Sequence, residues 1–197
     1  MRFLFKTDYD QDIRLAKHSG HVFWYGALGV LLVLAPWLFD EYWLAQLAFI
    51  LIYAIVGLGL MVLAGFTGLF SLGHAAFLGV GAYTQAILVN AGVPFTLAIL
   101  GAASLSALVG VVVAMPALRV KGIYLGMATL ALGFILEEVF ARWEHMTGGN
   151  SGLFVNAPEF LGTTVDTAGG FYFICLGITV LATLGVLNLL LSPTGRS

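Results

Sequence analysis

Charged residues are scarce in this sequence, and their scarcity limits the class of protein. Only 9% of the residues are Asp, Glu, Lys or Arg, whereas 60% are hydrophobic. A soluble domain typically carries about 25% charged residues, which keep its surface in water. Between Val22 and Leu118 the charged residues are Asp40 and Glu41 alone. A water-soluble fold is therefore excluded, and the long apolar runs predict helices that cross a membrane.

Cysteine and clustered basic residues are also lacking. The sequence has one cysteine, Cys175, and therefore no second cysteine for an internal disulfide. The four histidines are too scattered to match the ligand spacing of a zinc site, so we expect no metal. The eight Lys and Arg residues are dispersed and the net charge is -2, which argues against a nucleic-acid partner.

Six apolar stretches approach or reach the roughly 20 residues that a membrane-crossing helix needs. Polar or glycine-containing breaks separate them, as at Asp40-Glu41, 90–94 and 148–152. The sequence therefore predicts an all-α, polytopic transmembrane helix bundle with about six spans. Residues 1–21 form a cytoplasmic N-terminal segment and residues 22–197 the transmembrane domain. The expected spans, of which the third is short and glycine-rich, are Val22–Phe39, Trp43–Phe66, His74–Val89, Pro94–Met115, Ile123–Phe140 and Phe171–Leu191.

The basic residues predict the orientation, because cytoplasmic loops carry an excess of Lys and Arg. With six crossings and a cytoplasmic N-terminus, seven of the eight basic residues lie inside and only Arg142 lies outside. The first apolar run ends at Asp40 without a small-x-small cleavage site, so it is interpreted as a retained span. We therefore expect a multi-pass membrane protein whose 141–170 loop lies outside the cell. That loop is long enough to hold short structure of its own or a docking surface.

The 65–84 stretch has five glycines and carries polar groups within apolar surroundings. Glycine in a membrane helix permits close backbone approach or a local break, and a broken helix must face protein or a water-filled path. One interpretation is tight packing with the polar groups satisfied locally. The other is that part of the stretch lines a substrate path, for which His74 alone is a weak candidate. The polar residues in question are Ser71, His74, Tyr83 and Thr84.

Other polar features have simpler interpretations. Arg119 and Lys121 are expected to face anionic lipid headgroups, and the Gly122-x-x-x-Gly126 pattern is common by chance in apolar runs. The 147–153 segment resembles a phosphate-binding loop but lacks the G-K-[ST] ending, so nucleotide binding within this chain is rejected. Glu137 and Glu138 are expected to be interfacial. No relay of titratable groups crosses the middle of the membrane, which argues against proton-coupled transport.

Three segments together resemble the LivM-type permease family of branched-chain amino-acid ABC importers. The segments are Gly68-Leu-Phe-Ser-Leu-Gly-His-Ala-Ala-Phe77 with Gly81-Ala-Tyr-Thr84, Leu118-Arg-x-x-Gly122-x-Tyr124 with Thr129-Leu-Ala131, and Thr147-Gly-Gly-x-x-Gly-Leu153. Their order and spacing match the family, and the resemblance extends from about Ile50 to the last residue. Permeases for urea and short-chain amides share these segments, so the transport class is better defined than the substrate.

The resemblance implies a non-catalytic permease subunit that carries leucine, isoleucine and valine across the inner membrane. Its expected partners are a second permease subunit, two cytoplasmic ATP-binding subunits, a periplasmic substrate-binding protein and membrane lipid. ATP is bound by partners, so no cofactor is expected in this chain. We expect the substrate path to include some of the residues Ser71, Gly73, His74, Gly81, Tyr83, Thr84 and Thr129.

The resemblance also implies that Ser192, Gly195 and Arg196 begin a cytoplasmic loop that contacts the ATPase. Family members continue with further spans, so we expect the chain to be truncated at its C-terminal end. The alternatives are the same kind of permease for urea or amides, a secondary transporter or channel, and a membrane scaffold without transport activity. Co-purification with ATP-binding subunits separates the importers from the other classes.

Overall fold

The computed structural model describes residues 19–69, 71–117, 119–120, 122–155, 159–160, 163–164 and 167–191. The described chain is almost entirely helical, as the sequence predicted, apart from one two-residue antiparallel pair in which Glu159 lies opposite Thr164. The elements in chain order are α2 (Ser19–Leu38), α3 (Glu41–Phe66), α4 (His74–Asn90), α5 (Phe95–Ala117), α6 (Ile123–Arg142), α7 (Glu144–Thr147), η1 (Gly149–Ser151), β1 (Glu159–Phe160), β2 (Thr163–Thr164) and α8 (Ala168–Leu191).

Each of the six expected spans coincides with a helix, but the expected number of spans is wrong. Four helices among the described residues, α3, α5, α6 and α8, are long and apolar enough to cross a membrane, and the apolar part of α2, Phe23–Leu38, is shorter. Helix α4 has 17 residues. At about 1.5 Å per residue it rises about 26 Å, less than the roughly 30 Å of a hydrocarbon core. The glycine-rich sequence thus forms a short helix within the bundle.

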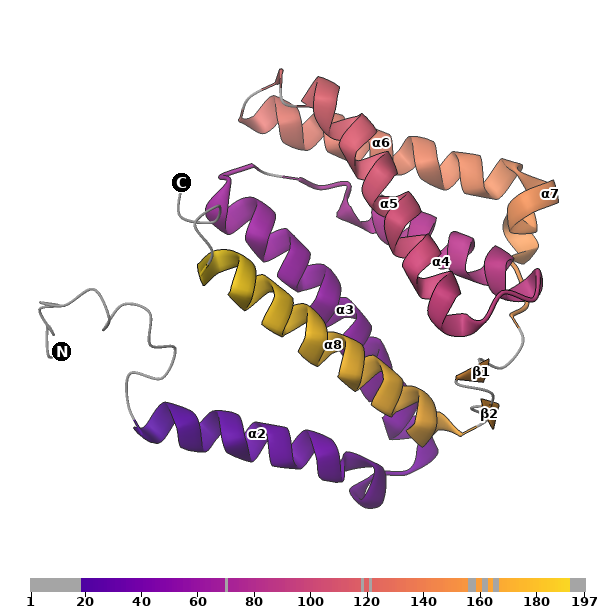
Figure 1. Cartoon of the computed structure of the whole chain (residues 1–197). Coiled ribbons are helices and arrows are strands. Elements are labelled where there is room, and N and C mark those ends of the chain that lie inside the picture. The colour runs from indigo at the N-terminus through magenta and orange to yellow at the C-terminus, as the bar shows by residue number, and fades with distance from the viewer. Residues whose placement is uncertain are drawn as a thin grey trace, which may run out of the picture.

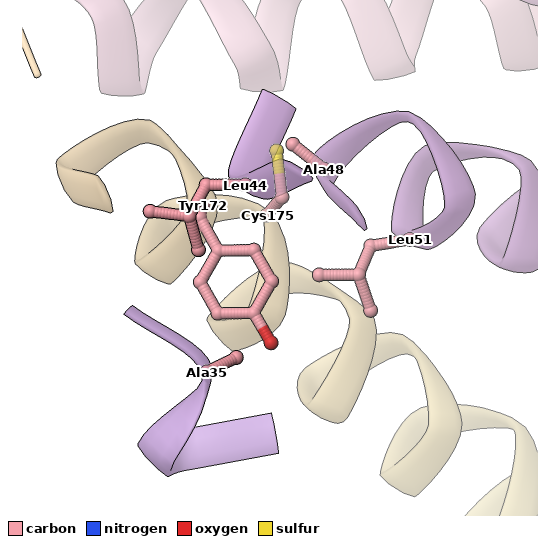
Figure 2. Close-up of a cluster of buried hydrophobic side chains, with 6 residues drawn as sticks. All are labelled: Ala35, Leu44, Ala48, Leu51, Tyr172 and Cys175. Atoms are coloured by element: carbon pink, nitrogen blue, oxygen red, sulfur yellow. The ribbon is translucent and has the colours of Figure 1, made fainter. Parts of the chain in front are cut away.

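Helices α2, α3 and α8 form one packed group, although α3 and α8 are far apart in the sequence. Gly169 lies near Leu44, and Thr179 donates a hydrogen bond to the carbonyl of Leu51 at 3.5 Å. The contact that lies later in α3 also lies later in α8, so the two helices run parallel, as Figure 1 also shows. Figure 2 shows the buried centre of this group, which consists of Ala35, Leu44, Ala48, Leu51, Tyr172 and Cys175.

Tyr172 joins α8 to α2 at a proline. Pro36 has no amide hydrogen, so it leaves the carbonyl of Leu32 without its usual helical partner. The hydroxyl of Tyr172 donates to that carbonyl at 2.8 Å. Tyr172 and Ala35 are both fully buried. The C-terminal end of α2 is therefore held to α8 by a hydrogen bond that the proline makes available.

Helices α4, α5 and α6 form the second group (Figure 1). A short turn joins α4 to α5: the amide of Val93 donates to Leu88 and that of Gly92 to Val89. Gly92 has a φ of 84°, the left-handed conformation that this type of helix ending requires, and Pro94 follows it. The turn that the sequence predicted at 90–94 is confirmed. It makes α4 and α5 antiparallel, whereas α4 and α6 run parallel through the Gly73–Thr129 and Gly79–Phe140 contacts.

The surface of the bundle is apolar. Large side chains such as Phe49 on α3, Leu108 on α5 and Phe134 on α6 are more than half exposed. Such a surface is stable in lipid, whereas water would disfavour it. The described protein is therefore a helical membrane bundle, and its interior polar groups mark where function can reside.

Candidate functional site

A tight backbone contact in the second group lies between Gly73 and Thr129. A Cβ atom added to Gly73 would lie 2.2 Å from the carbonyl oxygen of Thr129 and 3.0 Å from its carbonyl carbon. Because those atoms belong to the backbone of α6, they cannot move aside as a side-chain tip could. Gly73 immediately precedes α4, so its lack of a side chain allows the start of α4 to rest directly on α6.

The hydroxyl of Thr129 completes this contact. It accepts a hydrogen bond from the amide of Leu72 at 3.0 Å and donates to the carbonyl of Gly126 at 2.9 Å. Thr129 is 8% exposed, so both bonds lie inside the protein. The amide of Leu72 precedes the helix and has no partner within it. Thr129 therefore satisfies a backbone group that an apolar residue of the same size would leave unpaired.

An apolar cavity of about 440 Å³ lies on one side of the Gly73–Thr129 contact. Its wall is built mainly from aliphatic and small residues, with four polar side chains among them. The small residues of α5 follow one another at helical spacing, so they face the cavity as a set. The lining residues are Leu63, Leu69, Ser71, His74, Phe77, Ala103, Ser106, Ala107, Gly110, Val113, Ala114, Leu125 and Thr129.

Among the polar residues of this wall, His74 is the one with a buried side-chain atom that lacks a hydrogen-bond partner. Its Nδ1 atom is buried and has no hydrogen-bond partner. Its ring packs edge-on against Phe77, with centroids 6.2 Å apart. A Cβ atom at Gly59 would lie 3.2 Å from Nε2, so the glycine on α3 provides room for the imidazole. The hydroxyl of Ser106, in contrast, donates to the carbonyl of Phe77 at 2.9 Å.

A more polar groove of about 560 Å³ lies on the other side of the contact. Glu137 and Asn150 line it, and Tyr83 packs on Phe140 with ring centroids 4.8 Å apart. Neighbouring Glu138 is paired instead with Arg142 on the exposed face of α6. The groove is lined by Leu72, Gly73, Ala75, Ala76, Gly79, Tyr83, Leu130, Gly133, Phe134, Glu137, Phe140, Ala141, Gly149 and Asn150.

The two hollows follow one another along α6. Leu125 lines the apolar cavity, Phe140 lines the polar groove, and Thr129 lies between these two positions. From Leu125 to Phe140 the helix advances fifteen positions, which correspond to about 22 Å, most of the thickness of a hydrocarbon core. Along α6 the more polar groove thus follows the apolar cavity, and Gly73 and Thr129 meet where the two hollows adjoin.

The structure places the predicted path residues in three ways. Gly73 and Thr129 form the dividing contact, Ser71 and His74 line the apolar cavity, and Tyr83 lines the polar groove. The other two candidates lie elsewhere. No atom would lie within 4 Å of a Cβ at Gly81, and the hydroxyl of Thr84 donates to Val80 of its own helix at 2.7 Å. The residues predicted to begin the ATPase-contacting loop, Ser192, Gly195 and Arg196, lie outside the described residues.

The 147–153 segment is a connection held by its own hydrogen bonds. The buried hydroxyl of Thr147 donates to the carbonyl of Trp143 at 2.8 Å and also contacts that of Phe140, which are acceptors near the end of α6. Gly148 has a φ of 71°, and a Cβ there would lie 2.3 Å from the carbonyl oxygen of Gly152. The glycines are therefore needed for this tight loop, which together with α7 and the β1–β2 pair gives the 141–170 region its expected short structure.

Several lining residues were not singled out from the sequence. Ser106, Ala103, Ala107 and Gly110 line the apolar cavity, and their spacing on α5 was the available signal. Glu137 lines the polar groove, although the sequence favoured a purely interfacial position. Gly59 could not be identified in advance, because its role depends on a contact between α3 and His74. In the part of the chain that the structure describes, no three His, Cys, Asp or Glu side chains lie close enough together to hold a metal.

Comparison with known proteins identifies relatives across most of the chain. Residues 42–197 match the family described as branched-chain amino acid transport system / permease component. The high-affinity branched-chain amino acid transport system permease protein LivM of Escherichia coli is 30% identical over 196 residues, and that of Salmonella typhimurium is 31% identical over 172. These alignments cover 87% and 75% of this chain but 46% and 40% of the relatives, so the chain spans less than half of their length. No solved structure matches.

Proposed function

This chain belongs to the branched-chain amino acid transport system permease family, and we propose that it is a permease subunit that conducts branched-chain amino acids through the α4–α6 junction. The observation that carries the proposal is the pair of hollows that follow one another along α6 next to the Gly73–Thr129 contact. A conduit needs a region where solute can enter, a region where it can reside and a closure between them. Membrane helices that surround these two hollows are suited to conducting a solute across the bilayer.

The energy for transport comes, in this proposal, from partner subunits. The polar groups at the junction are the hydroxyls of Ser71 and Thr129 and the imidazole of His74, which do not form a nucleotide site. The proposed assembly contains a second permease subunit, two cytoplasmic ATP-binding subunits and a periplasmic substrate-binding protein. The chain itself is a conduit and has no catalytic residue.

The orientation is proposed from the distribution of basic residues. Arg119 follows α5 and Arg142 ends α6, so the two residues mark opposite ends of these antiparallel helices. The excess of Lys and Arg in the N-terminal segment and near Arg119 favours a cytoplasmic location for both. In a Cys175→Ala background, a membrane-impermeant maleimide added outside should label Ser151→Cys and leave Val120→Cys unlabelled. The opposite pattern would reverse the proposed orientation.

The same type of permease for urea or short amides is the second candidate, since such proteins share the sequence segments quoted above. The wall of the apolar cavity favours an aliphatic solute, because urea has no apolar surface to bury there. The test is uptake of labelled leucine by cells whose only branched-chain transporter contains this subunit, with unlabelled competitors. Isoleucine and valine should compete strongly and urea should not. Competition by urea alone would support the second candidate.

Pull-down experiments separate an ABC importer from a secondary carrier or channel. A tagged permease solubilised from its native membrane should retain ATP-binding subunits, whereas a carrier or channel functions without them. Loss of leucine uptake in a strain that lacks those subunits would support the importer. Unchanged uptake in that strain would contradict it.

A further inference from the structure

Building on the proposed function, we propose that the apolar cavity between α3, α4, α5 and α6 is the subsite that receives the branched aliphatic side chain of the substrate. In this proposal His74 contacts the charged end of the amino acid. Ala107 and Gly110 of α5, which the sequence analysis did not single out, line this subsite. In this proposal they contribute to the selectivity for the substrate side chain.

The size and lining of the cavity are sufficient to accommodate an aliphatic side chain. Its volume of about 440 Å³ lies within the range of about 300–1,000 Å³ that small-molecule sites occupy. Leu63, Leu125 and Val113 provide aliphatic walls, while Ala107 and Gly110 leave the space between them open. Burial of apolar surface is favourable in proportion to its area, so such a cavity prefers a longer side chain to a shorter one.

The unpaired polar atom in the cavity wall favours a zwitterionic amino acid as the occupant over the acyl chain of a lipid. Ser106 and Thr129 already donate to carbonyls of the protein. His74 Nδ1 and Gln85 Oε1 are the two buried side-chain atoms of the described residues without a hydrogen-bond partner, and only His74 lines this cavity. Buried polar atoms in proteins are almost always paired. An imidazole nitrogen can donate to a carboxylate or accept from an ammonium group, whereas an acyl chain offers neither.

The main variant is Gly110→Ala, which reduces the cavity by one methyl group. The added Cβ would lie 4.0 Å from the ring of Phe77, an ordinary van der Waals contact, so the fold should tolerate it. Ala107→Val fills the cavity further. Leu108→Val is the matched control, because Leu108 is on the same helix and 60% exposed. The transporter assembled with its partners takes up labelled isoleucine, and the concentrations of leucine and of valine that halve this uptake are measured.

The proposal predicts that Gly110→Ala and Ala107→Val weaken leucine relative to valine, which is one methylene smaller. One methylene in a closely fitting apolar pocket changes discrimination by about 10- to 200-fold. Because this cavity is larger than one side chain, the leucine-to-valine ratio should rise by at most about 10-fold in the more filled variant. Leu108→Val should leave the ratio unchanged. Equal ratios in all three variants at normal membrane abundance would overturn the subsite.

His74 provides a second readout on the same transporter. His74→Asn keeps a polar group near the position of Nδ1, and His74→Leu removes it. The proposal predicts that the asparagine variant retains more affinity for leucine than the leucine variant, at matched abundance. Equal affinities in the two variants would contradict the polar contact. If the unaltered transporter accumulates no branched-chain amino acid, the proposed function fails, and that result differs from normal uptake with an unchanged leucine-to-valine ratio.

Discussion

At Gly73 the backbone of α6 leaves no room for a side chain. The same glycine-rich stretch contains Gly81, around which a Cβ would meet nothing within 4 Å. Both residues are glycines in one apolar segment, and their sequence surroundings do not distinguish them. The difference between them is a contact with Thr129, a residue that follows more than fifty positions later. At the scale of the residue, packing decides which glycine matters.

The first prediction compares these two glycines. Gly73→Ala should destabilise the junction by roughly 3 kcal/mol, the upper end of the usual cost of overpacking, because backbone must move. Gly81→Ala should be tolerated, since alanine favours a helix by about 1 kcal/mol over glycine. Leucine uptake and membrane abundance are measured together. Loss of uptake in Gly81→Ala and normal uptake in Gly73→Ala would contradict the structure of the junction.

Tyr172 gives the second prediction. Tyr172→Phe keeps the ring but leaves the carbonyl of Leu32 unpaired at the Pro36 site, which should cost about 1–3 kcal/mol. The expected result is a lower unfolding midpoint in detergent. Tyr53→Phe, a change at a residue that is 64% exposed, is the control and should leave the midpoint unchanged. Equal midpoints for the two variants would show that the hydroxyl of Tyr172 does not hold α2.

At the scale of the element, the positions of the helices were predictable from the sequence, but the pairs of helices that pack together were not. The turn at 90–94 was predictable because glycine readily adopts the left-handed conformation that ends a helix, and Pro94 cannot continue that helix. The break at Asp40 was predictable because a charge is costly in lipid. The pairing of α3 with α8 was not predictable. Both helices are apolar on every side, so no amphipathic pattern indicates which face meets a partner. The length of α4 was judged from apolar residues alone, and its 17 residues make it short for a span.

The parallel arrangement of α3 and α8 can be tested with the natural cysteine. Ala48 and Cys175 belong to the same buried cluster (Figure 2), so Ala48→Cys should form a disulfide with Cys175 under mild oxidation in membranes. Phe49→Cys is the matched control, because Phe49 is 57% exposed and does not belong to the cluster. After cleavage at a protease site inserted before α8, the two fragments should remain linked in the first variant only. Linked fragments in the control alone would contradict the packing.

At the scale of the whole molecule, two helix groups surround a junction that neither group forms alone. His74 begins α4 in one group and lies against Gly59 of α3 in the other. Helix α6 then carries both hollows, with Thr129 between them. The sequence identified five residues of this region, four of which are polar residues in apolar segments and one of which, Gly73, belongs to the glycine-rich stretch. The sequence analysis did not identify Ala107, Gly110 or Glu137 as lining residues, because small residues at helical spacing and end-of-helix carboxylates are common in membrane proteins whether or not they line a cavity.

The central proposal is that this chain conducts branched-chain amino acids as part of an ATP-driven importer. The most direct measurement is accumulation of labelled leucine in proteoliposomes that contain the assembled transporter, its binding protein and enclosed ATP. Accumulation should require ATP hydrolysis, stop with a non-hydrolysable analogue, and fall sharply with Gly73→Ala but not with Gly81→Ala. Leucine accumulation that continues without ATP, or that is equal in the two glycine variants at equal abundance, would contradict the proposal.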